Sequence, residues 1–303
     1  MKIVTVILTT YNSEKVIQRT LDSIYAQDGL GQWFAFELIV VDDMSTDTTP
    51  TILHSNELIF LNTEKNTGGP NAGRNMGLKR ATGHYICIAD HDDEWMKDRI
   101  IKLLPLADRA PIVTSGYTLI EGVKKTERVN SPNETGNAVN YYPVNCTFIQ
   151  KLSKRSGGQF VYMGNIIYRA ELKHILFEEE YGAVDFDWIL RLFYQRDSVE
   201  LCESLYLRHV EGENLSMDER YRLNDYKCSL KTLKHFQNEY PPQVKEGVRR
   251  VNGTLGRYYY VTGKMQEARR YLLNSGLSAK SLLYYLTTYG GAGLVKKYFK
   301  VFG

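Results

Sequence analysis

Short apolar runs alternate with amphipathic segments along the first hundred residues of the chain. The runs are rich in β-branched side chains, which is typical of strands buried on both faces. They lie at 3–8, 36–41, 58–61 and 85–89. Between them, apolar residues recur at helical spacing, and helices are predicted to begin at Asn12 or Ser13, at Ser45 and near Asn75. This alternation predicts right-handed βαβ units and therefore an α/β fold, with a Rossmann-like, mainly parallel sheet flanked by helices.

Polar side chains follow three of these strands directly. Tyr11-Asn12 comes after the first strand, Asp42-Asp43 after the second, and Asp90-His91-Asp92 after the fourth. The carboxyl ends of parallel strands meet at one edge of the sheet, where ligands bind in open α/β folds. We therefore expect these three segments to face one crevice.

Beyond residue 110 the pattern predicts more strands and fewer helices. Strands are expected at 112–120, from Tyr162 to Arg169 after a turn, and at 199–209. A helix is expected at 185–193, with acidic residues in its first turn, where the helix dipole favours them. The polar segment 121–140 has no clear period and is predicted to be an excursion or a mobile flap over the site.

The composition changes beyond Ser216, where Lys, Arg, Leu and Tyr dominate. The pattern there predicts three or four short helices, broken at Pro241-Pro242, Gly263 and Gly276. We therefore expect a domain at 1–215 followed by an all-helical region at 216–303. The last residues, 294–302, mix aromatic and basic side chains as an interfacial helix does. Peripheral contact with the inner leaflet of a membrane is one interpretation, and a solvated helix that packs on the protein body is the other.

Charge and cysteine content narrow the class of protein. With 38 Lys and Arg against 35 Asp and Glu, the formal charge is 38 − 35 = +3, too small a bias to indicate a nucleic-acid partner. The four cysteines are far apart and match neither a zinc spacing nor a disulfide framework, which is typical of a reducing cytosol. The sequence has no signal peptide and no run of 18 apolar residues, so we expect a cytoplasmic protein without a membrane span.

Four acidic residues and a histidine crowd the end of the fourth strand, at 90–94. Carboxylates packed this closely repel one another in apolar surroundings and need a counter-charge. Mg²⁺ or Mn²⁺ supplies one; these ions take one or two protein carboxylates and complete their shells with water and phosphate oxygens. The pattern therefore indicates a phosphorylated ligand. The alternative is a solvated acidic turn before a helix that begins near Met96.

Four segments together resemble the family 2 glycosyltransferases, enzymes of the nucleotide-diphospho-sugar transferase fold known as GT-A. Each segment alone is a weak signal, but their order and spacing are specific: Thr9-Thr10-Tyr11-Asn12, residues 41–47, residues 66–77, and Ala89-Asp90-His91-Asp92-Asp93. The resemblance covers residues 1 to about 215, and it implies a nucleotide-binding half at 1–110 and an acceptor-binding half at 111–215. It does not cover the helical region.

The resemblance implies donor-binding roles for Thr10, Tyr11, Asn12, Asp43, Gly69, Arg74 and Asp90. Asp43 would accept hydrogen bonds from the base or ribose, Tyr11 would lie near the base, and Arg74 would reach the diphosphate. Structural alternatives stay open. Asp43 can cap the following helix, Tyr11 can staple a helix entry, and the glycines spaced by four from residue 69 can serve close packing rather than an approach to phosphate.

The segment Asp90-His91-Asp92 also matches the metal-binding motif of the family. Asp92 is the expected direct ligand of Mn²⁺ or Mg²⁺, while His91 is expected to point away, because alternate side chains of a strand face opposite ways. His209 is a further candidate as a metal ligand or phosphate contact. Its alternative role is that of a structural histidine after a strand.

The catalytic base of the family lies in an acidic pair that opens a later helix, and the matching segment here is 183–192. Val184 replaces the usual Glu, but Asp185 keeps the aspartate position. Asp185 would take the proton from an acceptor hydroxyl that attacks the anomeric carbon, while the metal and Arg74 stabilise the departing diphosphate, so the product would be inverted. The alternative is stabilisation of the helix N-terminus, worth about 0.5 kcal/mol.

The resemblance thus implies transfer of a hexosyl or N-acetylhexosaminyl group from a UDP-sugar to a glycan or lipid-linked acceptor, in cell-surface polysaccharide synthesis. One alternative is a nucleotide-sugar-binding module that has lost turnover, for which Val184 is the support. A nicotinamide dehydrogenase is disfavoured, because no G-x-G-x-x-G follows the first strand.

Overall fold

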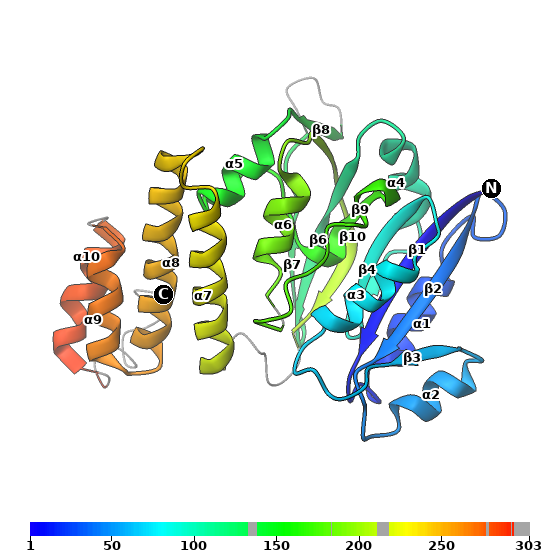
Figure 1. Cartoon of the computed structure of the whole chain (residues 1–303), viewed down its shortest axis with the longest axis horizontal. Coiled ribbons are helices and arrows are strands. Elements are labelled where there is room, and N and C mark those ends of the chain that lie inside the picture. Colours follow the sequence, from blue (N-terminus) through cyan, green and yellow to red (C-terminus); the bar gives the residue numbers. More distant parts are fainter. Residues whose placement is uncertain (133–137, 183, 211–217, 277–278, 292, 294–303) are drawn as a thin grey trace. The chain divides into compact units, whose positions relative to one another are not determined.

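The computed structural model describes residues 1–132, 138–182, 184–210, 218–276, 279–291 and 293 (Figure 1). The chain divides into two compact units. Unit 1 comprises Met1–Phe148 and Gly157–Asn214, and unit 2 comprises Ile149–Ser156 and Leu215–Gly303. The segment Ile149–Ser156 thus groups with the helices that follow residue 215. The roles assigned to the halves of the first domain stay predictions.

The described residues of unit 1 form a ten-stranded sheet in the order β3-β2-β1-β4-β9-β6-β10-β5, with β7 paired to β6 and β8 to β10. The first four strands in this order are parallel to one another, and β10 is parallel to β6. β9 joins the two halves by pairing antiparallel with both β4 and β6. The prediction of an α/β fold with a mostly parallel central sheet is confirmed. The strands are β1 Lys2–Thr10, β2 Phe34–Asp42, β3 Phe60–Asn62, β4 Tyr85–Asp90, β5 Glu94–Trp95, β6 Ile112–Glu121, β7 Lys124–Arg128, β8 Val139–Tyr142, β9 Ile166–Arg169 and β10 Ser198–His209.

The register of β1 aligns the carboxyl ends of three strands. Thr10 lies opposite Asp42 of β2, and Thr9 lies opposite Asp90 of β4. The three polar segments that follow these strands therefore lie at one edge of the sheet, as their positions in the sequence predicted.

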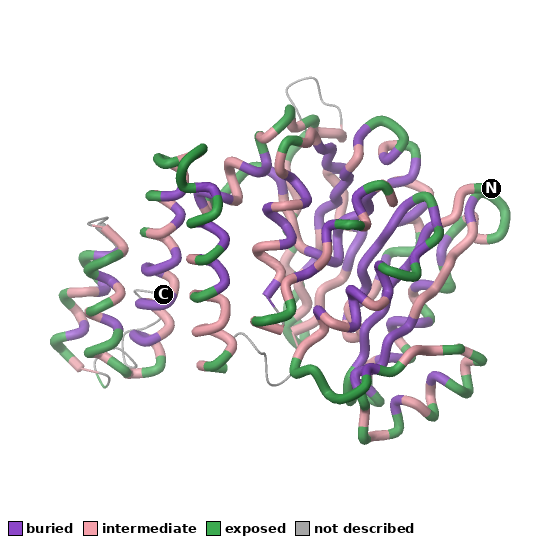
Figure 2. Tube along the Cα trace, viewed as in Figure 1, coloured by how far each residue is buried: buried purple, intermediate pink, exposed green. Residues whose placement is uncertain are grey.

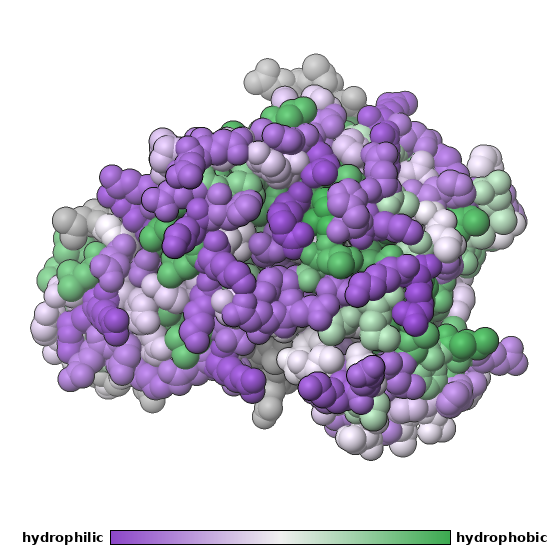
Figure 3. Space-filling view, in the orientation of Figure 1, coloured by the Kyte–Doolittle hydropathy of each residue, from purple (hydrophilic) through white to green (hydrophobic). Residues whose placement is uncertain are grey.

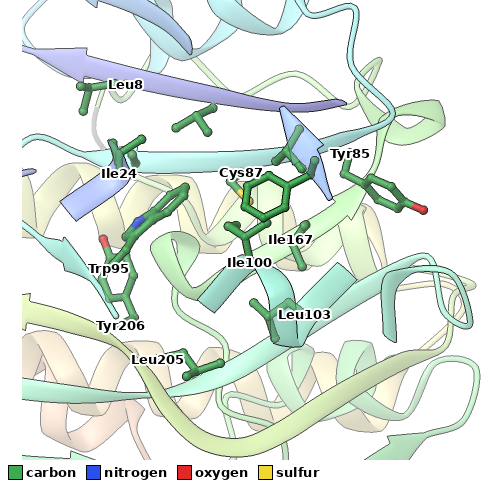
Figure 4. Packing of buried hydrophobic residues seen from close by; sticks show 14 of the residues in the cluster. Leu8, Ile24, Tyr85, Cys87, Trp95, Ile100, Leu103, Ile167, Leu205 and Tyr206 are labelled. Carbon is green, nitrogen blue, oxygen red and sulfur yellow. The ribbon is translucent and has the colours of Figure 1, made fainter. Parts of the chain in front are cut away.

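Helices cover both faces of this sheet. On one face, side chains of β1 such as Leu8 share a hydrophobic cluster with Ile24 of α1 and Ile100 of α4, and Figure 4 shows these side chains packed together. Buried positions run along the core strands and along the inner faces of the helices (Figure 2). The helices of this part of the chain are α1 Ile17–Tyr25, α2 Thr49–Ser55, α3 Asn71–Arg80, α4 Arg99–Ala107, α5 Cys146–Leu152 and α6 Phe186–Phe193.

Helix α3 lies on the other face of the sheet, and its glycines allow it to pack closely. A Cβ atom at Gly77 would lie 2.5 Å from Cγ2 of Ile7, and one at Gly73 would lie 3.1 Å from Cγ2 of Thr9. Contacts below 3 Å between carbon atoms are repulsive, so a side chain at Gly77 would push the helix away from β1. The packing alternative therefore explains Gly73 and Gly77.

The prediction for residues 121–140 was wrong in its first part. β6 continues to Glu121, and β7 turns back at Gly122 and pairs antiparallel with it. β7 is an edge strand whose residues are mostly exposed, so it has no buried face and shows no apolar alternation. β8 follows at the end of the same stretch, and residues 133–137 lie outside the described residues.

Unit 2 contains helices α7 Glu219–His235, α8 Pro241–Val261, α9 Met265–Asn274 and α10 Ala279–Thr287. α8 lies between the predicted breaks at Pro241-Pro242 and Gly263, and it continues through Gly247, Gly253 and Gly256. A Cβ atom at Gly256 would lie 2.9 Å from Cγ of Leu272, so this glycine allows α9 to pack closely on α8. Within the described part of the chain, no helix combines the length and apolar character needed to cross a bilayer. The basic aromatic segment 294–302 lies outside the described residues.

Glu37 of β2 holds the entry to β4 in place. Its carboxylate accepts hydrogen bonds from the backbone N–H (2.8 Å) and the hydroxyl (2.6 Å) of Thr82, from the N–H of Gly83 (3.2 Å), and from the Thr5 hydroxyl. Burial raises the pKa of Glu37, but these hydrogen bonds outweigh it, so the pKa lies below its ordinary value.

We predict that Glu37→Gln lowers the free energy of unfolding by about 1 kcal/mol at neutral pH, because an amide cannot accept all four hydrogen bonds. A depressed pKa stabilises the fold above the unfolded-state pKa, and this stabilisation is lost as the pH falls through the folded-state pKa. The difference between the two proteins should therefore shrink below about pH 4, which urea denaturation across a pH series measures. Glu64→Gln, at an exposed carboxylate, is the control; a Glu37→Gln effect independent of pH would contradict the argument.

Candidate active site

The turns after β1 and β2 are joined through Asn12. Its N–H donates to the hydroxyl of Ser45 (2.9 Å), and its side-chain oxygen accepts from the N–H of Thr46 (2.8 Å). Asn12 has a φ of 46°, in the left-handed region that asparagine tolerates better than most residues. Thr10, at the end of β1, is buried, and its hydroxyl pairs with that of Ser13. Thr10 and Asn12 thus fix the shape of this edge, while Tyr11 between them is 43% exposed.

Asp43 organises the loop that follows β3. Its carboxylate accepts hydrogen bonds from the Thr63 hydroxyl (2.8 Å) and from the N–H (3.0 Å) and hydroxyl (3.1 Å) of Thr67. The Thr67 hydroxyl also donates to the carbonyl of Gly69 (2.8 Å), which places Gly69 in the same loop. Asp47 accepts from the N–H of Thr49, at the start of α2, so the capping alternative for Asp43 is wrong.

Arg74 of α3 forms a buried ion pair with Asp90 at the end of β4. One terminal nitrogen lies 2.8 Å from Oδ1 of Asp90, and the other donates to Oδ1 of Asn71 (2.9 Å). The guanidinium also lies over the Phe177 ring, 5.2 Å from its centre. Arg74 is only 5% exposed, and its Nε has no hydrogen-bond partner among the described residues. The structure thus places the guanidinium fork on Asp90 and Asn71.

Three carboxylates crowd the end of β4. Asp90 accepts a hydrogen bond from the Tyr162 hydroxyl (2.9 Å), and Asp93 accepts from the Tyr206 hydroxyl (2.7 Å). Asp93 is 2% exposed, and burial together with the charges of Asp90 and Asp92 raises its pKa to about 8. Burial, and then the charge of Asp90, also raise the pKa of Asp92. This part of the site holds more negative charge than its protein surroundings compensate.

A divalent cation fits this arrangement. Arg74 balances Asp90, whereas no side-chain donor among the described residues reaches the Asp92 carboxylate. Within the same residues, no three His, Cys, Asp or Glu side chains are grouped as a metal site. Asp92 would therefore hold a cation with few protein ligands, as Mg²⁺ and Mn²⁺ accept when phosphate oxygens and water complete the shell.

His209 contacts Glu94 in this structure. Its Nε2 lies 2.6 Å from Oε1 of Glu94, and its backbone N–H donates to Oδ1 of Asp93 (2.8 Å). These contacts join the end of β10 to the acidic segment after β4. They agree with the structural alternative for His209, and its role as a metal ligand stays a prediction.

Asp185 lies directly before α6. Its side chain does not cap that helix, while Asp187 in the first turn is paired with Arg191, one turn later (2.8 Å). Asp187 therefore contributes to the stability of the helix. Asp185 occupies the N-cap position, where its charge favours the helix dipole, so its role as catalytic base and its helix-stabilising alternative both stay predictions.

Two asparagines of α3 hold the segment that leads to Asp185. Asn75 exchanges hydrogen bonds with Phe177, donating to its carbonyl (2.9 Å) and accepting from its N–H (2.7 Å). Asn71 donates to the carbonyls of Glu178 (2.7 Å) and Val184 (3.0 Å). Helix α3 thus contacts Asp90 through Arg74 and the segment before Asp185 through Asn71 and Asn75. These contacts bring the two parts of the site together.

The sequence reasoning missed several of these residues. Asn71 and Asn75 lie in a recognised segment, and their spacing of four on a helix is a signal that places both amides on one face. Tyr162 and Tyr206 come from distant parts of the chain and carry no spacing signal. Arg208 also lies over the Tyr162 ring, 4.5 Å from its centre, which adds a cation beside the acidic group.

The family model described as "Glycosyl transferase family 2" matches residues 5–176, more than half of the 303 residues. The chain belongs to glycosyl transferase family 2. It is a glycosyltransferase, as the four segments predicted. Three curated relatives give the extent of the similarity. The chain is 32% identical over 181 residues to the putative teichuronic acid biosynthesis glycosyltransferase TuaG of Bacillus subtilis, a match that spans 56% of the chain and 69% of TuaG.

Two further relatives are matched over shorter stretches. The identity is 35% over 112 residues with the succinoglycan biosynthesis protein ExoO of Rhizobium meliloti, covering 35% of the chain and 30% of ExoO. It is 41% over 99 residues with the poly(ribitol-phosphate) beta-N-acetylglucosaminyltransferase TarS of Staphylococcus aureus, covering 31% of the chain and 17% of TarS. Both matches thus span less than a third of those proteins.

Solved structures extend the similarity of fold beyond the family model. S. aureus TarS 1–349 in complex with UDP-GlcNAc has a TM-score of 0.61 at 21% identity, over 95% of this chain and 90% of that one. Mannosyltransferase PcManGT from Pyrobaculum calidifontis, in complex with GDP-Man and Mn²⁺, has a TM-score of 0.59 at 19% identity, over 99% and 82%. The shared fold therefore includes helices beyond residue 216, which the sequence motifs did not cover.

We predict that Asn75→Ala loosens the segment before Asp185, because Phe177 loses both hydrogen bonds to the amide side chain. Amide hydrogen exchange over residues 176–184 should become faster by about tenfold, while exchange in β1 stays unchanged. Asn274→Ala, at an exposed asparagine of α9, is the matched control. Unchanged exchange at 176–184 would show that α3 does not hold this segment.

Proposed function

We propose that this chain is a divalent-metal-dependent, inverting glycosyltransferase that uses a UDP-sugar. It moves a hexosyl or N-acetylhexosaminyl group to a hydroxyl of a glycan or lipid-linked acceptor, at the cytoplasmic face of a membrane, in cell-surface polysaccharide synthesis. One observation carries the proposal. Asp92 is a half-buried carboxylate with a raised pKa, and it lies beside the Arg74–Asp90 pair at the edge where β1, β2 and β4 end.

The relatives support the choice of donor and product. TarS is named as a beta-N-acetylglucosaminyltransferase and is seen with UDP-GlcNAc, and PcManGT is seen with GDP-Man and Mn²⁺. TuaG and ExoO are named for the biosynthesis of teichuronic acid and succinoglycan. A nucleotide-sugar donor, a divalent cation and a polysaccharide product therefore recur among proteins that share this fold or sequence.

The donor would lie along the carboxyl edge of the sheet. Asp43, fixed by Thr63 and Thr67, would accept a hydrogen bond from the base or ribose, and exposed Tyr11 would offer its ring to the base. Gly69, in the loop that Asp43 fixes, would let the backbone approach the diphosphate. Asp92 would hold the cation, which when bound neutralises diphosphate charge. Arg74 holds the Asp90 carboxylate in place through their ion pair.

Asp185 would act on the acceptor. Its carboxylate would accept the proton of the acceptor hydroxyl while that oxygen forms a bond to the anomeric carbon and the bond to the diphosphate breaks. Attack opposite to the leaving group inverts the anomeric configuration. The helix α3 supports this role, because Asn71 and Asn75 fix the segment that ends at Asp185.

A nucleotide-sugar-binding module without turnover is the second candidate, and it rests on Val184. Val184 is 2% exposed, and its carbonyl accepts a hydrogen bond from Asn71. The valine thus has a packing role, and its presence leaves Asp185 in position. This favours the enzyme over the silent module.

We predict that UDP-sugar binding, measured by calorimetry, requires Mn²⁺ or Mg²⁺, and that Asp92→Asn weakens this metal-dependent binding by at least about tenfold. Without the charge of Asp92, the cation would lose its ligand from the protein and would no longer link the protein to the diphosphate. Asp28→Asn, at an exposed aspartate, is the control and should bind as the wild type does. Donor binding that is equally strong with chelator present would overturn the metal-dependent mechanism.

We predict that Asp185→Asn binds the donor within about twofold of the wild type but transfers sugar about 10³-fold more slowly, because an amide cannot accept the proton. Asp187→Asn is the matched control: it loses the pair with Arg191 and some stability, and it keeps most of the transfer rate. Product configuration is read by NMR of the new glycosidic bond. Donor binding by the wild type without transfer or hydrolysis, across a broad acceptor set, would establish the silent module instead.

A further inference from the structure

The two units of the chain carry opposite charge. By sequence, unit 2 has 19 Lys and Arg and 6 Asp and Glu, a net charge of 19 − 6 = +13. Unit 1 has 19 Lys and Arg and 29 Asp and Glu, a net charge of 19 − 29 = −10. The overall charge of +3 conceals this division. A unit with so large a positive charge attracts an anionic partner.

Helix α10 of unit 2 exposes a row of apolar side chains. Leu282, Leu283 and Leu286 are 43%, 43% and 56% exposed, and Leu273 of α9 is 57% exposed. The three leucines of α10 lie on one face of the helix, at spacings of three and four residues. Figure 3 shows hydrophobic side chains at the surface of the α9–α10 region.

The opposite face of α10 is already used for packing within unit 2. Tyr284 is buried, with its ring 4.9 Å from that of Tyr260, and the Tyr260 hydroxyl pairs with that of Thr287 (2.8 Å). The helix is therefore apolar on both faces, and such a helix is normally covered on both. The outward leucines are the face that a partner would cover.

Arginine and tyrosine side chains are exposed on α9 and directly after α10, in the same unit as the exposed leucines. Arg269 of α9 lies over the Tyr289 ring, 4.8 Å from its centre, and Tyr289 is 65% exposed. Arg270, which follows Arg269 in sequence, is exposed. Leucines together with tyrosine and arginine are the composition of helices that lie in the interface of a bilayer, with the apolar side chains inserted and the cations at the lipid headgroups.

We propose that the outward face of α10, together with Leu273, Arg269 and Arg270 of α9, is a docking surface for an anionic lipid bilayer. Charge complementarity decides the partner. A second copy docked through the same face would bring two units of +13 together, which repel. A soluble anionic polymer would use the cations but leave the leucines in water. An anionic bilayer would contact both the cations and the leucines. The docking surface belongs to unit 2, whereas the acidic cluster at the end of β4 belongs to unit 1.

Vesicle flotation with the full chain tests the proposal. The wild type should float with vesicles of phosphatidylcholine and phosphatidylglycerol, and far less with phosphatidylcholine alone. The double variant Leu282→Ser/Leu286→Ser should lower the partition coefficient by at least about tenfold, because two inserted side chains are lost. Ile59→Ser/Val123→Ser is the matched control, since both residues belong to unit 1 and are exposed, at 94% and 103%. Arg270→Glu should weaken binding at low salt, and the effect should fade at high salt.

Hydrogen exchange of the wild type gives a second readout that needs no variant. Vesicles with phosphatidylglycerol should slow exchange in α9 and α10 and leave β1 unchanged. Four results would overturn the proposal: no flotation of the wild type, normal flotation of the leucine variant, no protection of α10 by vesicles, or light scattering that shows the leucines holding an oligomer together. Binding to soluble polyphosphate that survives in the leucine variant, without vesicle binding, would assign the charge to a polymer instead. None of these readouts depends on sugar transfer.

Discussion

The ion pair between Arg74 and Asp90 is the contact on which the arrangement of the candidate site depends. Both groups are largely removed from water, and a buried charge is tolerated only when a partner and hydrogen bonds compensate its desolvation. Asp90 ends the central strand β4, and Arg74 lies on the helix that packs across β1 and β2. The pair therefore joins the edge of the sheet to α3, and through Asn71 and Asn75 to the segment that ends at Asp185.

The pair also shapes the electrostatics of its neighbours. Arg74 supplies a full positive charge to Asp90, whereas Asp93 accepts hydrogen bonds from neutral donors: the hydroxyls of Tyr206 and Tyr162 and the backbone N–H of His209. Asp92 lies between them in sequence and shares their negative field. The protein thus compensates part of the charge at this edge and leaves the rest to be balanced by a ligand. A cation bound with a diphosphate is a partner of the right charge and chemistry.

Much of the fold could be predicted from the sequence, because parallel strands that are buried on both faces have continuous apolar sequences and the candidate ligand-binding residues follow them directly. The carboxyl ends of β1, β2 and β4 were predicted in this way to within two residues. The hairpin of β6 and β7 was missed because β7 has no buried face and therefore no apolar pattern. The contacts of Tyr162 and Tyr206 with the acidic residues were missed. Tyr162 precedes β9 and Tyr206 lies in β10, and both strands pair with strands that are distant from them in sequence, so no local spacing predicts these contacts. The sequence predicted Arg74 as a site residue, but its pairing with Asp90 follows only from the structure.

The absent side chain at Gly77 links the core to the chemistry. Ile7 of β1 occupies the space that a Cβ atom at Gly77 would need, so this contact, together with that of Gly73 with Thr9, limits the distance between α3 and the sheet. The same helix carries Asn71, Arg74 and Asn75 within the two turns that precede Gly77. Positions 7 and 77 are therefore coupled: in related sequences, alanine at 77 requires a residue smaller than isoleucine at 7. Substitution at either position is also constrained by sugar transfer at the site, because it would move the helix that carries the site residues.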